Sequence, residues 1–185
     1  MHAFPIAAIA IVVALNSVSA QPTINEIIKK VEATFEPADA RPGQTVTLKI
    51  KLELLDGWHT YPLKQDDPGA KAQINKLTFP EPGSIVFVGE LLDPLGAKEK
   101  AEPLAQIEKM FYYPGGATWE RKAVVLPNAA PGAVTSIIKF RVLVCDKNNC
   151  LPPKPLTLDA TLKVTGAPME IDPQYRAEVE KALKK

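Results

Sequence analysis

The sequence predicts an all-β fold, an immunoglobulin-like antiparallel β-sandwich with a short C-terminal helix. Apolar residues make up 46% of the 185-residue chain, and 22 Lys and Arg nearly balance 21 Asp and Glu, which argues against disorder. Short segments of alternating apolar and polar residues recur along the chain. The 18 prolines and 10 glycines place turns between these segments, a spacing typical of a sandwich.

The first twenty residues form a separate segment. They contain no Lys, Arg, Asp or Glu, residues 3–15 are almost entirely apolar, and positions 18–20 carry small residues suited to cleavage. This apolar stretch is too short for a comfortable membrane span. We therefore expect a signal peptide over residues 1–20 that is cleaved after Ala20, a periplasmic or secreted location, and no membrane span in the mature chain.

Cleavage there would leave 165 residues, enough for one well-buried domain. We predict that this domain covers residues 21–167 and that residues 168–185 form a helical tail. The net charge of +1 comes without a continuous basic stripe, so we expect no nucleic-acid partner.

The elements follow in order from this pattern. Residues 25–35 fit a short helix or an edge strand, and the pattern leaves that choice open. Residues 46–54 are the clearest strand, because apolar residues alternate there with Thr, Lys and Glu. Further short strands are predicted at residues 76–79, 85–88, 122–126, 136–144 and 156–164.

Two segments differ from these strands. Residues 97–108 are charged and are interrupted by Pro103, so we expect a surface loop with at most a short helical turn. In the tail, Asp172-Pro173 is typical of an N-cap followed by proline at the first helical position, and residues 175–183 have helical spacing.

The two cysteines, Cys145 and Cys150, lie at a junction between two predicted strands. The residues between them, 146–149, are typical of a turn, and Pro152-Pro153 stiffens the exit. In an oxidising compartment such a pair tends to form a disulfide.

A disulfide across so short a loop fits two roles. As a staple it would contribute roughly 2 kcal/mol, against about 4.7 kcal/mol for a loop of about 100 residues. As a redox pair near a rim, it would be opened by a partner's thiolate without unfolding the domain. The spacing alone leaves these two roles equally open.

The sequence lacks the residues or motifs that other kinds of active site would need. His59 would be the one histidine left after cleavage, so a blue-copper or zinc site would lack ligands and we expect no metal. A thioredoxin fold is not expected, because the chain has neither a Cys-x-x-Cys motif nor a βαβ pattern. A hydrolase pairing His59 with a cysteine would need an activating motif that we do not recognise.

The segment FRVLVCDKNNCLPPKPLTL, residues 140–158, resembles the redox segment of the N-terminal periplasmic domain of DsbD, the bacterial transmembrane thiol-disulfide interchange protein. Two cysteines in a hairpin followed by Pro-Pro are the mark of that family. DGWHTY, residues 56–61, is similar to the family's Gly-aromatic-x-x-Tyr segment, and the aromatic pair in KMFYYPGG is a third match. In order and spacing, the three matches cover most of the mature chain.

The resemblance implies an immunoglobulin-like sandwich that relays electrons in the periplasm as a protein thiol-disulfide oxidoreductase. Cys145 and Cys150 would be the redox pair, and no bound cofactor would be required, because the sulfurs themselves carry two electrons. Thioredoxin-like periplasmic or membrane-bound proteins would be the electron donor and acceptor.

The resemblance also implies roles for four other residues. Phe111 and Tyr112 would belong to a cap loop that covers the sulfurs, while His59 and Tyr61 would line the site. Tyr61 or Tyr112 would be placed to donate a hydrogen bond to a developing thiolate. Ordinary packing explains each of the aromatic residues equally well.

The chain also departs from the family. Four residues separate its cysteines where the best-known member has five, and the acidic part of the cap loop has no obvious match. With no transmembrane electron channel in the sequence, the electrons would come from another protein, and their direction stays open. The residues alone do not show which cysteine is attacked first, and the resemblance favours Cys150 as the partner-facing sulfur. The alternative is a secreted immunoglobulin-like binding or scaffold module with a purely structural disulfide.

Overall fold

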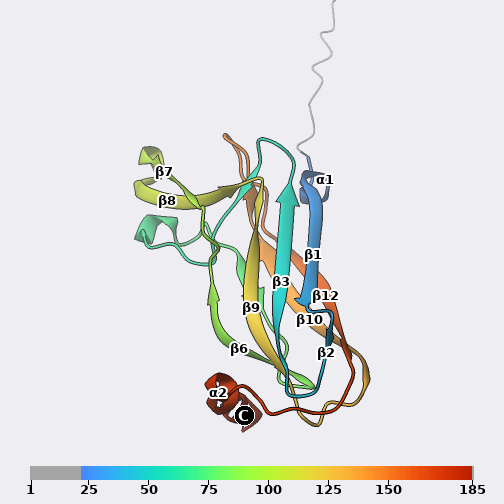
Figure 1. Cartoon of the computed structure of the whole chain (residues 1–185). Helices are drawn as coiled ribbons and strands as arrows, with labels where there is room; N and C mark the ends of the chain where they lie inside the picture. Colours follow the sequence, from blue (N-terminus) through green and yellow to red (C-terminus); the bar gives the residue numbers. More distant parts are fainter. Residues whose placement is uncertain (1–21, 185) are drawn as a thin grey trace, which may run out of the picture.

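The computed structural model describes residues 22–184, so the predicted signal peptide lies outside the described residues. Two four-stranded sheets pack face to face around one core, and a third sheet lies at one end of this sandwich (Figure 1). The sheets are antiparallel except for one short parallel pair, β2 with β12. The predicted all-β sandwich with a short C-terminal helix is confirmed.

The first sheet has the strand order β1-β3-β9-β6. Its strands are β1 (Ile28–Glu36), β3 (Thr45–Leu54), β9 (Gly116–Val125) and β6 (Ile85–Leu92). Alternate side chains of a strand point to opposite faces, so β3 sends every second residue into the core. These buried residues are Val46, Leu48, Ile50, Leu52 and Leu54.

A single turn of helix, α1 (Ile24–Ile27), leads directly into β1. Both alternatives left open for residues 25–35 are therefore present in succession.

The second sheet has the order β2-β12-β10-β5. Its strands are β2 (Asp39–Ala40), β12 (Lys154–Val164), β10 (Gly132–Val142) and β5 (Lys76–Thr78). A long antiparallel ladder joins β10 to β12, with Gly132 opposite Val164 at one end and Val142 opposite Lys154 at the other. The second of these ends leads towards the cysteine segment.

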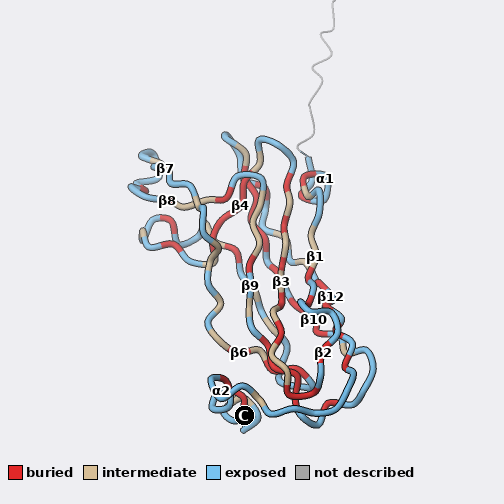
Figure 2. Tube along the Cα trace, viewed as in Figure 1, coloured by how far each residue is buried: buried red, intermediate tan, exposed pale blue. Residues whose placement is uncertain are grey.

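The core between the two sheets is centred on Trp119, which is fully buried. Its ring meets Phe140 of the opposite sheet edge-to-face at 5.4 Å between centroids, a favourable geometry for aromatic pairs. Its indole Nε1 donates a hydrogen bond of 2.9 Å to Asp93, which also accepts from the backbone amide of Leu63. Buried residues concentrate along the sandwich strands, as Figure 2 shows.

The third sheet has the order β11-β4-β8-β7. Its strands are β11 (Val144–Cys145), β4 (His59–Thr60), β8 (Ile107–Pro114) and β7 (Lys98–Glu102). Two short 3-10 helices accompany it, η1 (Pro68–Ala70) and η2 (Pro103–Ala105). The hairpin of β7 and β8 projects from the end of the sandwich, with η2 at its tip (Figure 1).

The expected surface loop over residues 97–108 was wrong, because this segment forms most of that hairpin. Pro103 lies at the tip, in η2, where a missing amide donor interrupts no strand pairing. Gln106 closes the turn with a left-handed backbone. Every residue of β7 is exposed or half-buried, so no apolar alternation marked it as a strand.

The predicted C-terminal helix is confirmed as α2 (Pro173–Leu183). Its N-cap is Asp172, whose side chain accepts a hydrogen bond of 3.0 Å from the backbone amide of Gln174. Tyr175 and Val179 pack on the outer face of the first sheet, against β6 and the final part of β9.

Candidate functional site

The backbone of the third sheet brings the cysteine segment next to β4. Cys145 pairs with His59, and Val144 pairs with Thr60, across the antiparallel β11–β4 bridge. The other side of β4 pairs with β8. Two residues far apart in the sequence, His59 and Cys145, are therefore held opposite each other by strand pairing.

A buried asparagine, Asn75, locks this arrangement. Its Nδ2 donates to the Thr60 hydroxyl at 2.8 Å and to the Tyr61 carbonyl at 2.6 Å, while its Oδ1 accepts from the Leu143 amide at 2.9 Å. One side chain thus ties β4 to the segment leading into Cys145. Sequence reasoning missed Asn75, because a single asparagine between predicted strands looks like an ordinary loop residue.

Cys145 and Cys150 form a disulfide, with their Cα atoms 4.0 Å apart. The turn between them has its own hydrogen bonds. Oδ1 of Asp146 accepts from the amides of Asn148 and Asn149 at 2.7 and 2.6 Å, and these bonds lower the pKa of the Asp146 carboxyl. Backbone bonds join Asp146 to Asn149 and Leu151 to Val144, at 2.9 Å each.

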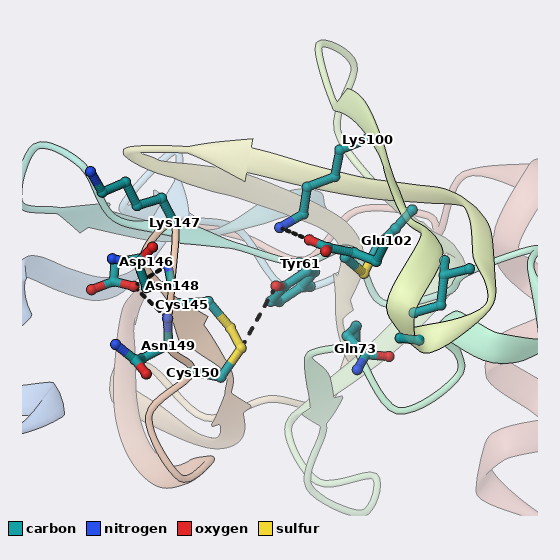
Figure 3. A pocket seen from close by; sticks show the side chains of 13 residues that line it. Tyr61, Gln73, Lys100, Glu102, Cys145, Asp146, Lys147, Asn148, Asn149 and Cys150 are labelled. Atoms are coloured by element: carbon teal, nitrogen blue, oxygen red, sulfur yellow. Dashed lines mark hydrogen bonds and ion pairs between the residues drawn. A yellow bond between two sulfur atoms is a disulfide. The ribbon is translucent and has the colours of Figure 1, made fainter.

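The two cysteines differ in their exposure. Cys145 is 1% exposed and packs in a small apolar cluster that includes Met110 and Leu143, whereas Cys150 is exposed. Beside the disulfide lies an open pocket of about 220 Å³. Both cysteines line it, together with residues of the cysteine turn and of the β7–β8 hairpin, including Glu102 (Figure 3).

Tyr61 points its hydroxyl towards the disulfide (Figure 3). Its Oη lies 4.0 Å from Cys150 Sγ and 3.2 Å from His59 Nε2. Burial raises the pKa of Tyr61 to about 12, so the hydroxyl keeps its proton at neutral pH. A neutral phenol with a proton to donate therefore lies beside the sulfur of the exposed cysteine.

His59 does not line this pocket; it contacts Tyr61 and is 7% exposed. Burial, together with the positive charge of Lys100, lowers the pKa of His59 to about 4. The imidazole is therefore neutral at neutral pH. Lys100 Nζ lies 3.5 Å from His59 Nε2 and 3.0 Å from Glu102, with which it forms an ion pair.

The structure brings Tyr112 towards this group but leaves Phe111 outside it. The ring of Tyr112 meets the ring of His59 edge-to-face at 5.0 Å. Phe111 exchanges two backbone hydrogen bonds with the side chain of Gln65 and lies next to Lys109. Both aromatic residues belong to strand β8 and not to a loop, and neither lines the pocket beside the disulfide. Their binding roles stay predictions.

Sequence reasoning also missed the contribution of the hairpin residues Lys100 and Glu102. Their segment was expected to be a loop, and only the pairing of β7 with β8 brings their side chains to the disulfide pocket.

Two features are absent from residues 22–184. No helix in this part of the chain is long and apolar enough to cross a membrane. The same residues contain no cluster of three or more His, Cys, Asp or Glu side chains able to hold a metal ion. The chemically distinctive group here is the disulfide with its phenol and imidazole neighbours.

No protein-family model matches the chain, and no curated protein sequence matches it either. Similar solved structures include the N-terminal periplasmic domain of ScsB from Proteus mirabilis, at 13% identity and a TM-score of 0.43. That match covers 80% of this chain and 51% of the other, so this chain spans about half the length of the ScsB chain.

Two further structures match over 74% of this chain. One is AggA, the major subunit of aggregative adherence fimbriae type I from Escherichia coli, at 16% identity, 95% coverage of that chain and a TM-score of 0.32. The other belongs to a type I cohesin–dockerin complex from Clostridium thermocellum, at 15% identity, full coverage (100%) and a TM-score of 0.31. These weak similarities assign no function to this chain, so its function must be inferred from the site itself.

Proposed function

We propose that this chain is a protein thiol-disulfide oxidoreductase of the type of the DsbD N-terminal domain, working through the Cys145–Cys150 pair. The observation that carries the proposal is the asymmetry of the disulfide. Cys150 is exposed beside an open pocket, whereas Cys145 is 1% exposed. An incoming thiolate needs access to only one sulfur, and this arrangement selects which one.

The exchange begins when a thiolate of a reduced partner attacks Cys150 Sγ. A mixed disulfide forms, the Cys145–Cys150 bond breaks, and Cys145 leaves as a thiolate. The partner's second thiolate then attacks the partner's own sulfur in the mixed disulfide, and Cys150 leaves as a thiolate. The partner has lost two electrons and the cysteine pair has gained them, while each thiolate takes up a proton from water.

The hydrogen bonds of the cysteine turn support this role over that of a staple. The bonds that the amides of Asn148 and Asn149 donate to the Asp146 carboxylate do not involve the sulfurs, and neither does the backbone bond that the Leu151 amide donates to the Val144 carbonyl. Opening the disulfide therefore leaves the turn in place. A reversible redox pair needs this property, and a permanent staple does not.

The proposed partners are thioredoxin-like proteins of the periplasm or of the membrane, because a pair of adjacent thiols is needed both to form and to resolve the mixed disulfide. The predicted signal peptide supports a periplasmic or secreted location, and so does the disulfide, because disulfides persist in oxidising surroundings. The proposal leaves the direction of electron flow to experiment.

The test is a trapping experiment with two single variants, Cys145→Ala and Cys150→Ala. Each reduced variant is mixed with a thioredoxin-like protein that keeps one active cysteine, activated as its mixed disulfide with thionitrobenzoate. We expect Cys145→Ala to form the protein–protein disulfide and release the yellow leaving group. Cys150→Ala should react far more slowly, because its remaining thiol is buried.

A second measurement separates exchange from a permanent bond. The reduction potential of the wild-type disulfide is determined by equilibration with thioredoxin-type redox couples. A relay needs a potential above about −300 mV, whereas structural disulfides lie below it. A value well below that limit, or equal trapping by both variants, would overturn the proposal in favour of a binding or scaffold module.

A further inference from the structure

Three side chains connect the β7–β8 hairpin to Cys150. Lys100 Nζ lies 3.5 Å from His59 Nε2, His59 Nε2 lies 3.2 Å from Tyr61 Oη, and Tyr61 Oη lies 4.0 Å from Cys150 Sγ. Lys100 comes from β7, His59 from β4, and Tyr61 directly follows β4. The exchange steps described above use none of these three contacts.

The chemistry of the donors fixes the protonation of His59. An ammonium group can only donate hydrogen bonds, so the contact with Lys100 requires Nε2 to be the unprotonated nitrogen of the neutral ring. The ring proton then lies on Nδ1. Tyr61 must therefore donate, and not accept, in its contact with Nε2.

The Tyr61 hydroxyl has a second acceptor within reach. A disulfide sulfur is a weak acceptor, and at 4.0 Å it competes poorly with Nε2 at 3.2 Å. A Cys150 thiolate is charged and accepts much more strongly. When the disulfide opens, we therefore expect the Tyr61 hydroxyl to donate its hydrogen bond to the sulfur of Cys150 and no longer to His59.

Such a turn would leave Nε2 of His59 without its phenol partner in a buried position, which is unfavourable. Lys100 prevents this, because its ammonium group stays on the same nitrogen. The ion pair with Glu102, at 3.0 Å, holds Lys100 in place.

We propose that Lys100 and His59 are positioning residues that free the Tyr61 hydroxyl to donate its hydrogen bond to the Cys150 thiolate. The inference rests on the proposed function and adds to it a way of stabilising one redox state. The proton stays on Tyr61 throughout, so no further oxidant, reductant or base is required. The stabilised thiolate is the leaving group of the second exchange step and the nucleophile in the reverse direction.

Several charged and titratable groups surround His59 and must be separated in a test. Lys100 and Glu102 approach from β7, Tyr112 from β8, and Asp146 from the cysteine turn. Lys147 provides a matched control for charge. It lines the same pocket as Lys100, but its side chain points away from Tyr61 (Figure 3).

The experiment measures the alkylation rate of Cys150 by iodoacetamide as a function of pH, in the full chain carrying Cys145→Ala. The midpoint of the profile gives the pKa of the Cys150 thiol. We expect Tyr61→Phe to raise it by roughly one unit, a tenfold loss of thiolate below the midpoint. Lys100→Met and His59→Gln should each raise it by roughly half a unit, about threefold.

The decisive comparison repeats Lys100→Met in the Tyr61→Phe background. If Lys100 acts through the phenol, its effect there falls to that of Lys147→Met, which reports charge alone. An effect of Lys100→Met that equals that of Lys147→Met with Tyr61 present, or that persists undiminished without Tyr61, would overturn the inference. Lys100 lies on the β7–β8 hairpin and is only half-buried, so the Lys100→Met variant should fold even if His59→Gln does not.

Alkylation by a small molecule needs no protein partner. The pKa measurement tests the inference about Lys100 and His59, and the trapping experiment tests the proposed function. Failure of one can therefore be distinguished from failure of the other.

Discussion

Reducing the disulfide should cost the protein little stability. The bond closes a loop between residues five apart, Cys145 and Cys150. Removing the constraint on so short a loop lowers the free energy of unfolding by roughly 2 kcal/mol on the chain-entropy argument. A domain of this size typically unfolds with about 5 to 15 kcal/mol, so the reduced protein should remain folded. The unfolding temperature should fall by roughly 4 to 8 °C.

The assay is urea unfolding of the wild-type chain with and without a phosphine reductant, followed by circular dichroism. The double variant Cys145→Ala, Cys150→Ala is the control, because its stability should not respond to the reductant. Amide exchange at Asn148 and Asn149 should stay slow after reduction, since their hydrogen bonds to Asp146 do not involve sulfur. A loss above about 5 kcal/mol, or an unfolded reduced chain, would refute the reasoning and indicate a structural disulfide.

Three further predictions concern the framework that holds the site. Gly116 has φ +116° and a Cβ there would lie 1.9 Å from a carbonyl oxygen of β3, so Gly116→Ala should cost roughly 3 kcal/mol or more in urea unfolding. Gly115→Ala, at φ +72° with no atom within 4 Å of the added carbon, should cost only about 1 to 2 kcal/mol; equal losses would contradict the clash. The pKa of His59 is about 4 in the folded protein against 6.5 ordinarily, so the unfolded chain binds more protons between these values and stability should fall as the pH drops from 6.5 to 4, by up to about 1.4 kcal/mol per unit. His59→Gln should flatten that slope in unfolding curves recorded across this range, and an unchanged slope would show that the imidazole is not the cause. Asp93→Ala removes the acceptor of the buried Trp119 Nε1 and should cost roughly 1 to 3 kcal/mol in thermal unfolding, whereas Asp93→Asn, which keeps an acceptor oxygen, should cost less; the reverse order would contradict this role.

The parts of the fold that the sequence could predict are those with one buried and one exposed face. Strand β3 has five alternate residues in the core and Thr, Lys and Glu between them, so its period was visible. Helix α2 was visible from its cap at Asp172-Pro173. The cysteine hairpin was visible because turn residues and prolines stand between two alternating segments.

The parts that sequence reasoning missed depend on partners far away in the chain. Strand β7 has no buried residue, and the hairpin is defined by the pairing of β7 with β8 and of β8 with β4. Asn75 and Lys100 acquire their roles only when Leu143 and His59 are brought next to them. Nothing in the local pattern distinguishes such residues from ordinary polar surface residues.

Helix α2 has a practical consequence for handling the protein. The helix packs against the final part of β9. The other end of β9 lies next to β4, where the amide of Gly115 donates a hydrogen bond to the carbonyl of Trp58. Helix α2, near the C-terminal end, therefore lies at the opposite end of the sandwich from α1 and the third sheet (Figure 1). Pro22, in contrast, shares a surface groove with Pro152 and Pro153. Attachment to a sensor chip through the C-terminal end would leave the sulfur-bearing end facing the solution, and attachment through residue 22 would crowd it.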